Sequence, residues 1–234
     1  MGLDEGLGPL FNGDSCRACH FEPGLGGAGE IELNVMQHGT LADDVFEAPE
    51  YGTVLHKLAT VGHARREHGP EHNIFEMRQT PSILGAGLIE GIEEDDIRAN
   101  EDPEDLDGDG IRGVAQTLPD GRLGRFGWKA QVPSLHEFVR DAMTVELGMT
   151  VPPEEGFTFG ASEDDDEVAD PELSVEEIEL VIFFMAQLAP PEPSQVVPGG
   201  LEMFEAVGCD GCHTPDLPGE NGPVRLFSDL LLHS

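Results

Sequence analysis

Basic residues are scarce in this chain, and long apolar runs are missing. Only 12 lysine and arginine residues stand against 47 aspartate and glutamate residues, which gives a formal net charge of -35 at pH 7. A surface of this sign repels phosphate backbones and anionic lipid headgroups, so the composition excludes nucleic acid and anionic membranes as partners. No stretch approaches the roughly 18 consecutive apolar residues of a membrane-spanning helix, and we expect no membrane span.

The first residues, MGLDEGLGPLF, also lack the basic and apolar regions of a secretory signal. The acidic residues are spread along the whole chain rather than gathered in one tail. This distribution is typical of a salt-adapted surface, whose self-repulsion is screened by abundant counter-ions. It also suits a surface that attracts cationic partners and metal ions, and composition leaves both interpretations open.

Cysteine is equally scarce, and its placement is not random. All four cysteines lie in two copies of the motif C-x-x-C-H, which are Cys16, Cys19 and His20, and Cys209, Cys212 and His213. A zinc site would combine both pairs, but they lie near opposite ends of the chain, far beyond the usual spacing of about 15–20 residues. A thioredoxin-like motif needs a βαβ context, which the sequence lacks. Disulfide bonds between the cysteines are an alternative that the sequence leaves open.

None of these alternatives requires a histidine beside each pair. A c-type haem does require it, because the two thiols bond to the vinyl groups and the histidine that follows supplies the proximal nitrogen to iron. The sequence therefore predicts two covalently bound haems, with His20 and His213 as the proximal ligands.

Helical patterns outnumber strand patterns along the chain. Two helices are expected at 134–147 and 174–188, each opened by a serine with a glutamate three residues later, the S-x-x-E capping box. The spacing of apolar residues in 41–62 is also helix-like. We see no apolar alternation long enough for a sheet, so we predict a mainly α fold with long loops.

Two further segments contain residues that indicate their local backbone structure. Residues 78–100 begin with an X-Pro step, which favours an extended segment that leads into a helix. Residues 101–127 are rich in Asp-Gly steps and glycine, which leaves no room for a long element. A short amphipathic helix is expected immediately before Cys209.

Several stretches of the chain resemble the di-haem oxidoreductases, a family also labelled thiol-oxidoreductase-like and distantly similar to bacterial di-haem cytochrome c peroxidases. They cover nearly the whole chain and read GLGPLFNGDSCRACHFEPGLGGAG, RQTPSILGAGLIEGI, DPEDLDGDGIRGVA, GRFGWKAQVPSL, ELGMT, DPELSVEEIE and LFSDLLLH. The resemblance implies an extracytoplasmic, periplasmic redox protein with two class I cytochrome c-like modules.

On this basis we expect a first haem domain with inserted loops at 1–189, a linker at 190–197, and the start of a second, truncated haem domain at 198–234. The export signal such a protein needs is not in this sequence, so we expect a mature chain or one incomplete at its start. Two functions follow. One is a peroxidase-like enzyme that takes electrons from a redox partner protein and reduces peroxide or another small-molecule oxidant. The alternative is a pure electron-transfer cytochrome without substrate chemistry.

The sixth ligand of each iron decides between them, since a methionine or histidine there favours electron transfer and an open site permits peroxide chemistry. Met143 and Met149, in and just after the helix at 134–147, are candidate distal ligands, although a methionine on a helix is also typical of core packing. His136, His38 and His233 are further candidates.

A calcium site is expected in the loop EDLDGDGIRG. Asp105, Asp107 and Asp109 alternate as in positions 1, 3 and 5 of a calcium loop, and Gly110 stands where the sharp turn is needed. The match is partial because Gln116 occupies the position of the bidentate glutamate, so an acidic turn without a metal is the alternative. The polar stretch with His56, His63, His68 and His72 is interpreted as a solvated loop or as a source of haem or metal ligands. No catalytic acid or base is identified.

Overall fold

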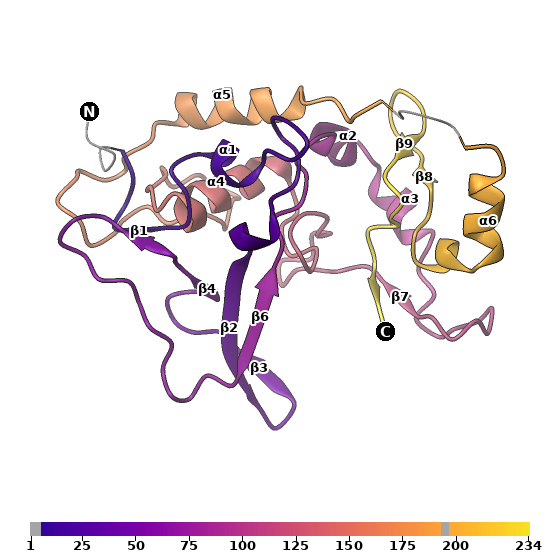
Figure 1. The fold of residues 1–234 in the computed structure, drawn as a ribbon, viewed down its shortest axis with the longest axis horizontal. Coiled ribbons are helices and arrows are strands. Elements are labelled where there is room, and N and C mark those ends of the chain that lie inside the picture. The colour runs from indigo at the N-terminus through magenta and orange to yellow at the C-terminus, as the bar shows by residue number, and fades with distance from the viewer. Residues whose placement is uncertain (1–5, 193–196) are drawn as a thin grey trace. The chain divides into compact units, whose positions relative to one another are not determined.

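The computed structural model describes residues 6–192 and 197–234, and Figure 1 draws them as a ribbon. The helices in these ranges are α1 (Cys16–Cys19), α2 (Ala86–Glu90), α3 (Glu94–Arg98), α4 (Leu135–Glu146), α5 (Val175–Ala186) and α6 (Gly200–Ala206), with short 3-10 turns η1 (Ile31–Leu33) and η2 (Cys209–Gly211). The strands are β1 (Leu10–Phe11), β2 (Val35–Ala42), β3 (Val45–Glu47), β4 (Val54–Leu55), β5 (Leu58–Ala59), β6 (Ile74–Arg78), β7 (Gly113–Val114), β8 (Asp216–Leu217), β9 (Val224–Arg225) and β10 (Leu232–His233).

The expectation of a mainly α chain built from two cytochrome c-like modules is wrong. Helix accounts for 23% of the described residues and strand for 16%. The strands form one four-stranded sheet and three two-stranded pairs. Residues 41–62, whose apolar spacing is helix-like, contain β3, β4 and β5 instead. Gly52 and Gly62 both have positive φ angles there, which a right-handed helix does not accommodate.

The two long helices are confirmed, each 12 residues long. At the start of α4 the Ser134 hydroxyl accepts a hydrogen bond from the Glu137 amide at 3.1 Å and donates one to its carboxylate at 3.3 Å. At the start of α5 the Ser174 amide donates to the Glu177 carboxylate at 2.9 Å. Both capping boxes therefore satisfy amide groups that the first turn of a helix leaves without partners. Among the helices described, none combines the length and the apolar character that a bilayer crossing requires.

One compact unit consists of the described residues up to Leu84 together with Val139–Phe184. Its main sheet has β2 paired antiparallel with β3, β4 and β6. The pairing of β2 with β6 starts at Val35 opposite Arg78. Since β6 ends where β2 begins, the residues that follow Arg78 return to the segment that follows the first C-x-x-C-H motif.

The second compact unit consists of Gly85–Phe138 and the described residues of Met185–Ser234. Its apolar core combines residues before 124 with residues after 216, and these are Ile92, Ile97, Ala115, Leu123, Leu217 and Val224. β7 pairs with β10, and β8 pairs with β9. Each C-x-x-C-H motif thus belongs to a different unit. The expected linker at 190–197 lies partly outside the described residues, at 193–196, and the expected domain bounds stay a prediction.

Candidate functional site

The first C-x-x-C-H motif is wound into a single helical turn, α1. The His20 amide donates to the Cys16 carbonyl at 2.8 Å, and the Ala18 amide donates to the Ser15 carbonyl at 3.0 Å. Cys16 is exposed, Cys19 is half-buried, and neither forms a disulfide. Although Cys16 is exposed as a whole residue, neighbouring atoms desolvate its thiol, and desolvation raises the pKa of both thiols; for Cys19 the nearby Lys57 partly opposes this effect. The two sulfur atoms are therefore protonated thiols near neutral pH.

The imidazole of His20 has a defined proton position. Its Nδ1 lies 2.8 Å from the carbonyl oxygen of Pro81. A carbonyl oxygen can only accept a hydrogen bond, so Nδ1 carries the proton and Nε2 keeps its lone pair. Burial lowers the pKa of His20, which favours this neutral form. A neutral histidine oriented through Nδ1 by a backbone carbonyl is the usual arrangement of a metal ligand.

Backbone hydrogen bonds hold the Pro81 carbonyl in place. The Gly29 amide donates to the Thr80 carbonyl at 2.9 Å, and the Ile83 amide donates to the Gly26 carbonyl at 2.9 Å. Gly29 is required for this approach, because a Cβ there would lie 2.8 Å from the Thr80 Cβ. The loop after the first motif and the segment after β6 are thus joined on both sides of Pro81.

The second motif repeats the same arrangement. It follows α6 directly, and the His213 amide donates to the Cys209 carbonyl at 2.9 Å. The Nδ1 of His213 lies 3.0 Å from the carbonyl oxygen of Phe227, which again places the proton on Nδ1 and leaves the lone pair on Nε2. Cys209 is exposed, Cys212 is half-buried, and both thiols are free.

Apolar side chains remain exposed beside both motifs. In the segments that flank the first motif in sequence they are Phe21, Leu25 and Ile31, and in those around the second they are Leu201, Met203, Val207 and Phe227. Exposed apolar side chains of this kind are available for a bound group to cover. Two thiols, one imidazole with a free Nε2 and an apolar surround are what a c-type haem requires, so the residues present at both motifs fit this group.

The candidate distal ligands lie at several places. Met143 is buried in α4, and the Met149 amide donates to its carbonyl at 3.0 Å. His38 is buried in β2 and contacts His72. The Nε2 of His233 lies 3.1 Å from an oxygen of Asp229. None of these contacts involves His20 or His213, so a distal role stays a prediction for each, and also for His136 in α4.

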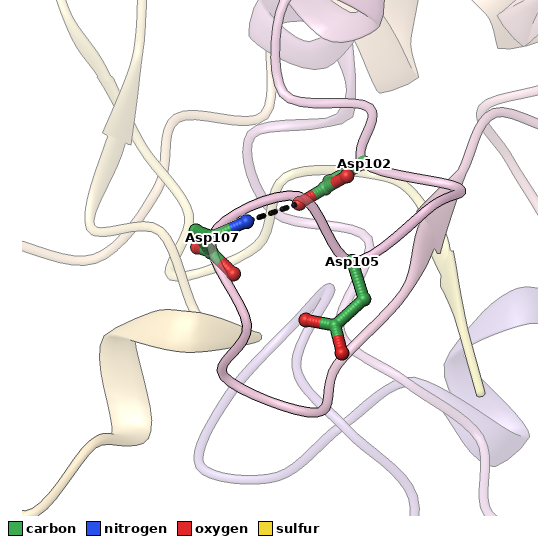
Figure 2. Close-up of side chains that lie close together, drawn as sticks. All are labelled: Asp102, Asp105 and Asp107. Atoms are coloured by element: carbon green, nitrogen blue, oxygen red, sulfur yellow. Dashed lines mark hydrogen bonds between the residues drawn. The ribbon is translucent and has the colours of Figure 1, made fainter.

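Three carboxylates converge in the acidic loop, and only two of them are those expected from the sequence. Figure 2 shows Asp102, Asp105 and Asp107, each of which offers an oxygen within 4.8 Å of the others. The Asp102 carboxylate also accepts hydrogen bonds from the Leu106 amide at 2.9 and 2.8 Å. The third expected residue, Asp109, instead accepts a hydrogen bond from the Ile111 amide at 2.7 Å. Asp102 lies outside the alternating pattern, so sequence spacing offered no signal for it.

Comparisons with known proteins give one match. The family model described as "Di-haem oxidoreductase, putative peroxidase" matches residues 71–224. No curated protein and no solved structure matches the chain. The matched range contains the second C-x-x-C-H motif, the acidic loop and Pro81, whose carbonyl orients His20.

Proposed function

Since this chain belongs to the di-haem oxidoreductase family, we propose that its two haems are covalently bound c-type haems, one at each C-x-x-C-H motif. Cys16 and Cys19 would form the thioether bonds of one haem, and His20 would be its proximal ligand. The other haem would be held by Cys209, Cys212 and His213 in the same way.

The observation that carries the proposal is the pair of equivalent hydrogen bonds at His20 and His213. In both motifs Nδ1 donates to a main-chain carbonyl, at 2.8 and 3.0 Å, and Nε2 is left with its lone pair. This bond fixes the tautomer and the ring orientation, and it makes the ligating nitrogen more basic. A disulfide module would need neither imidazole held in this way.

We propose that the protein transfers electrons from a redox partner protein and reduces peroxide or a related small-molecule oxidant at one of its haems. Reduction of hydrogen peroxide to two water molecules consumes two electrons and two protons. The bound haems supply the one-electron chemistry, and the polypeptide sets ligation, solvent access and orientation. The alternative is electron transfer alone. Met143, which is buried, would favour this function if its thioether were the sixth ligand of an iron.

Carbon monoxide binding separates the two functions. We expect the reduced, haem-loaded protein to bind one equivalent of carbon monoxide, seen as a shift of the Soret band, because peroxide reduction needs an accessible iron. The oxidised protein serves as the control, since carbon monoxide does not bind ferric haem. If neither carbon monoxide nor cyanide changes the spectrum, electron transfer alone is the function.

The distal predictions are tested in the same assay with Met143→Leu and Met149→Leu. Removing a thioether that ligates iron should open a further binding site for carbon monoxide, whereas removing a methionine that only fills space should leave the stoichiometry unchanged. A similar volume is kept in both variants, so a folding defect is not expected.

We also propose that the acidic loop binds calcium through Asp102, Asp105 and Asp107. Calcium at 100 times its Kd should raise the free energy of unfolding by about 2.7 kcal/mol. Asp105→Asn should abolish this gain, whereas Asp109→Asn should keep it. Denaturant unfolding with calcium and with a chelator measures the difference, and equal stability of the wild-type protein in both conditions would exclude the site.

Covalent haem attachment takes place outside the cytoplasm, so we propose a periplasmic or otherwise extracytoplasmic location. Fractionation of the producing cells, with haem staining of each fraction, would test it. Haem-staining protein of this mass confined to the cytoplasm would contradict the proposal.

A further inference from the structure

The segment between β5 and β6 is attached to the rest of the first unit through a few side chains. Residues 61–72, which we call the strap, contain turns but no helix or strand, and Val61 to His68 are all exposed. Directly after the strap, the Asn73 side chain accepts a hydrogen bond from the Leu41 amide at 2.7 Å and donates one to the Leu41 carbonyl at 3.0 Å. The strap therefore ends at a residue that is itself bound to β2.

Two exposed side chains of the strap pack on aromatic rings outside it. The guanidinium of Arg66 lies 4.9 Å from the centroid of the Tyr51 ring, and the His68 ring packs edge-on to the Phe75 ring at 4.8 Å. Contacts of this kind stabilise only weakly when the cationic side chain is exposed. What holds the strap more firmly must be a buried contact.

That buried contact is a hydrogen bond between two imidazoles. The Nδ1 of His72 lies 2.8 Å from the Nδ1 of His38 in β2, and the ring centroids are 4.4 Å apart. His38 is 1% exposed, and the side chain of His72 is 6% exposed. One proton lies between the two Nδ1 atoms, so the bond exists only while one of them keeps its lone pair. In the described part of the chain neither ring hydrogen-bonds to a residue of a C-x-x-C-H motif.

The outer nitrogens of the pair have little that could compensate a positive charge. The Nε2 of His38 is buried and has no hydrogen-bond partner among the described residues. The Nε2 of His72 lies 3.5 Å from a carboxylate oxygen of Glu71, but the Glu71 side chain is 63% exposed. A carboxylate in water stabilises a neighbouring charge only weakly. A proton added to the pair is therefore a buried charge without an adequate partner.

The other groups that face His38 also oppose its protonation. Tyr51 and Phe75 present uncharged rings, with centroids 5.7 and 6.4 Å from that of His38. His68 adds a repulsive charge when it is protonated, and Arg66, stacked on Tyr51, is a permanent cation. Burial, and to a smaller extent the neighbouring histidines, lower the pKa of His38.

The direction of the pH effect follows from this shift. Release of the strap would expose the imidazoles to water, where the pKa of histidine is about 6.5. Because the pKa of His38 is lowered while the strap is bound, the released form takes up more protons. The bound form is therefore fully favoured above about pH 6.5 and loses stability as the pH falls below that value. Once both rings are protonated, two N–H groups face each other and the hydrogen bond is lost.

We propose that the hydrogen bond between His38 and His72 is a pH-sensitive switch, which holds the strap against β2 at neutral pH and releases it in acid. The pairing of β2 with β6 stays intact, because Asn73 is bound to Leu41 and the strand pairs begin directly after it. Release is thus local to the strap, and it does not depend on haem attachment.

The test is limited proteolysis of the full-length, haem-loaded protein with a glutamyl endopeptidase that is active in both weak acid and weak base. Cleavage after Glu67, in the middle of the strap, is followed by mass spectrometry and divided by the cleavage rate of a free peptide of residues 61–72 at the same pH. This relative rate should rise about tenfold or more from pH 7.5 to pH 5, because uptake of one proton changes the released fraction about tenfold per pH unit. Cleavage after Glu76, in β6, should stay slow at both pH values.

Substitutions that remove the titrating groups should remove the pH dependence. His38→Gln and His72→Gln should each bring the ratio of the relative rates at the two pH values close to one. His63→Gln is the matched control, because His63 is an exposed histidine of the strap that contacts the Thr60 hydroxyl at 3.1 Å, and it should keep the wild-type ratio. Circular dichroism and haem content show which variants fold, and His72→Gln decides alone should His38→Gln fail to fold.

Several results would overturn the switch. One is a relative rate that does not change with pH in the wild-type protein, and another is the wild-type ratio in a folded His38→Gln or His72→Gln protein. Equal acceleration after Glu67 and Glu76 would indicate general unfolding instead of local release. The Soret band of both variants should match that of the wild-type protein, since a displaced band would make the substituted imidazole a ligand of iron rather than part of the switch.

Discussion

Replacement of Cys16 and Cys19 by serine should remove one of the two haems from the matured protein and leave the other bound. The thioether bonds form on these two sulfur atoms, and the serine hydroxyl does not replace them. Mass spectrometry of the intact chain should show the mass of one haem in the variant and two in the wild-type protein. The pyridine spectrum should lose about half of its haem absorbance per chain.

Cys209→Ser with Cys212→Ser is the matched control and should give the same loss from the other unit. A combination of all four substitutions should leave no covalent haem. If the double variants keep two haems, or if the wild-type thiols are found paired in disulfides, covalent attachment at these motifs is excluded. All four cysteines are free thiols in the structure, and this is the state from which covalent haem attachment begins.

Arg122→Ala should destabilise the protein by about 3 kcal/mol, the largest stability loss that we expect from a single surface substitution. The Arg122 guanidinium forms an ion pair with the Glu137 carboxylate, which is fully buried at the start of α4. It also pairs with Asp120 at 2.7 Å. These carboxylates raise the pKa of Arg122, with Glu137 as the main cause. Removal of the arginine leaves a buried carboxylate without that counter-charge, which costs far more than the loss of an exposed pair.

Arg225→Ala is the matched control, since the pair of Arg225 with Asp216 is exposed on both sides and should contribute less than about 1 kcal/mol. Urea unfolding of the haem-loaded variants measures both values. Addition of Glu137→Gln to Arg122→Ala should recover part of the loss, because it removes the buried charge. If Arg122→Ala is no less stable than Arg225→Ala, the pair of Arg122 with the buried Glu137 carboxylate does not stabilise the fold.

The sequence predicted those parts of the fold that local chemistry determines. The helices α4 and α5 were predicted because a serine and a glutamate three residues apart satisfy each other within one turn. The sheet was missed for two reasons: the pairing of β2 with β6 is distant in sequence, and the hairpin from β2 to β3 turns through Asp43 and Asp44 without the glycine typical of such turns. β3 is exposed along its whole length, and β6 is mostly exposed, so neither shows the alternation of a half-buried strand. β2 pairs with β3, β4 and β6, and of these only β3 follows it directly along the chain.

The candidate site also combines features that local sequence predicts with contacts between residues distant in sequence. The C-x-x-C-H motifs are local and were found from spacing alone, and so was the alternation of Asp105 and Asp107. The acceptor for His20 is the carbonyl of Pro81, far along the chain, and only the return of β6 to the start of β2 brings it near. Asp102 joins the acidic loop because its carboxylate caps the Leu106 amide, a contact that follows from the turn rather than from residue spacing.

Both proximal histidines are oriented by main-chain oxygen atoms, those of Pro81 and Phe227. Every amino acid carries such an oxygen, so a scan that exchanges side chains one at a time cannot delete either acceptor. The acceptor is lost only when the backbone itself moves, as after an insertion or deletion between β6 and α2. Substitutions at Pro81 or Phe227 should therefore change the orientation of the proximal histidines little. A change in the length of the loop that carries either carbonyl would alter that orientation directly.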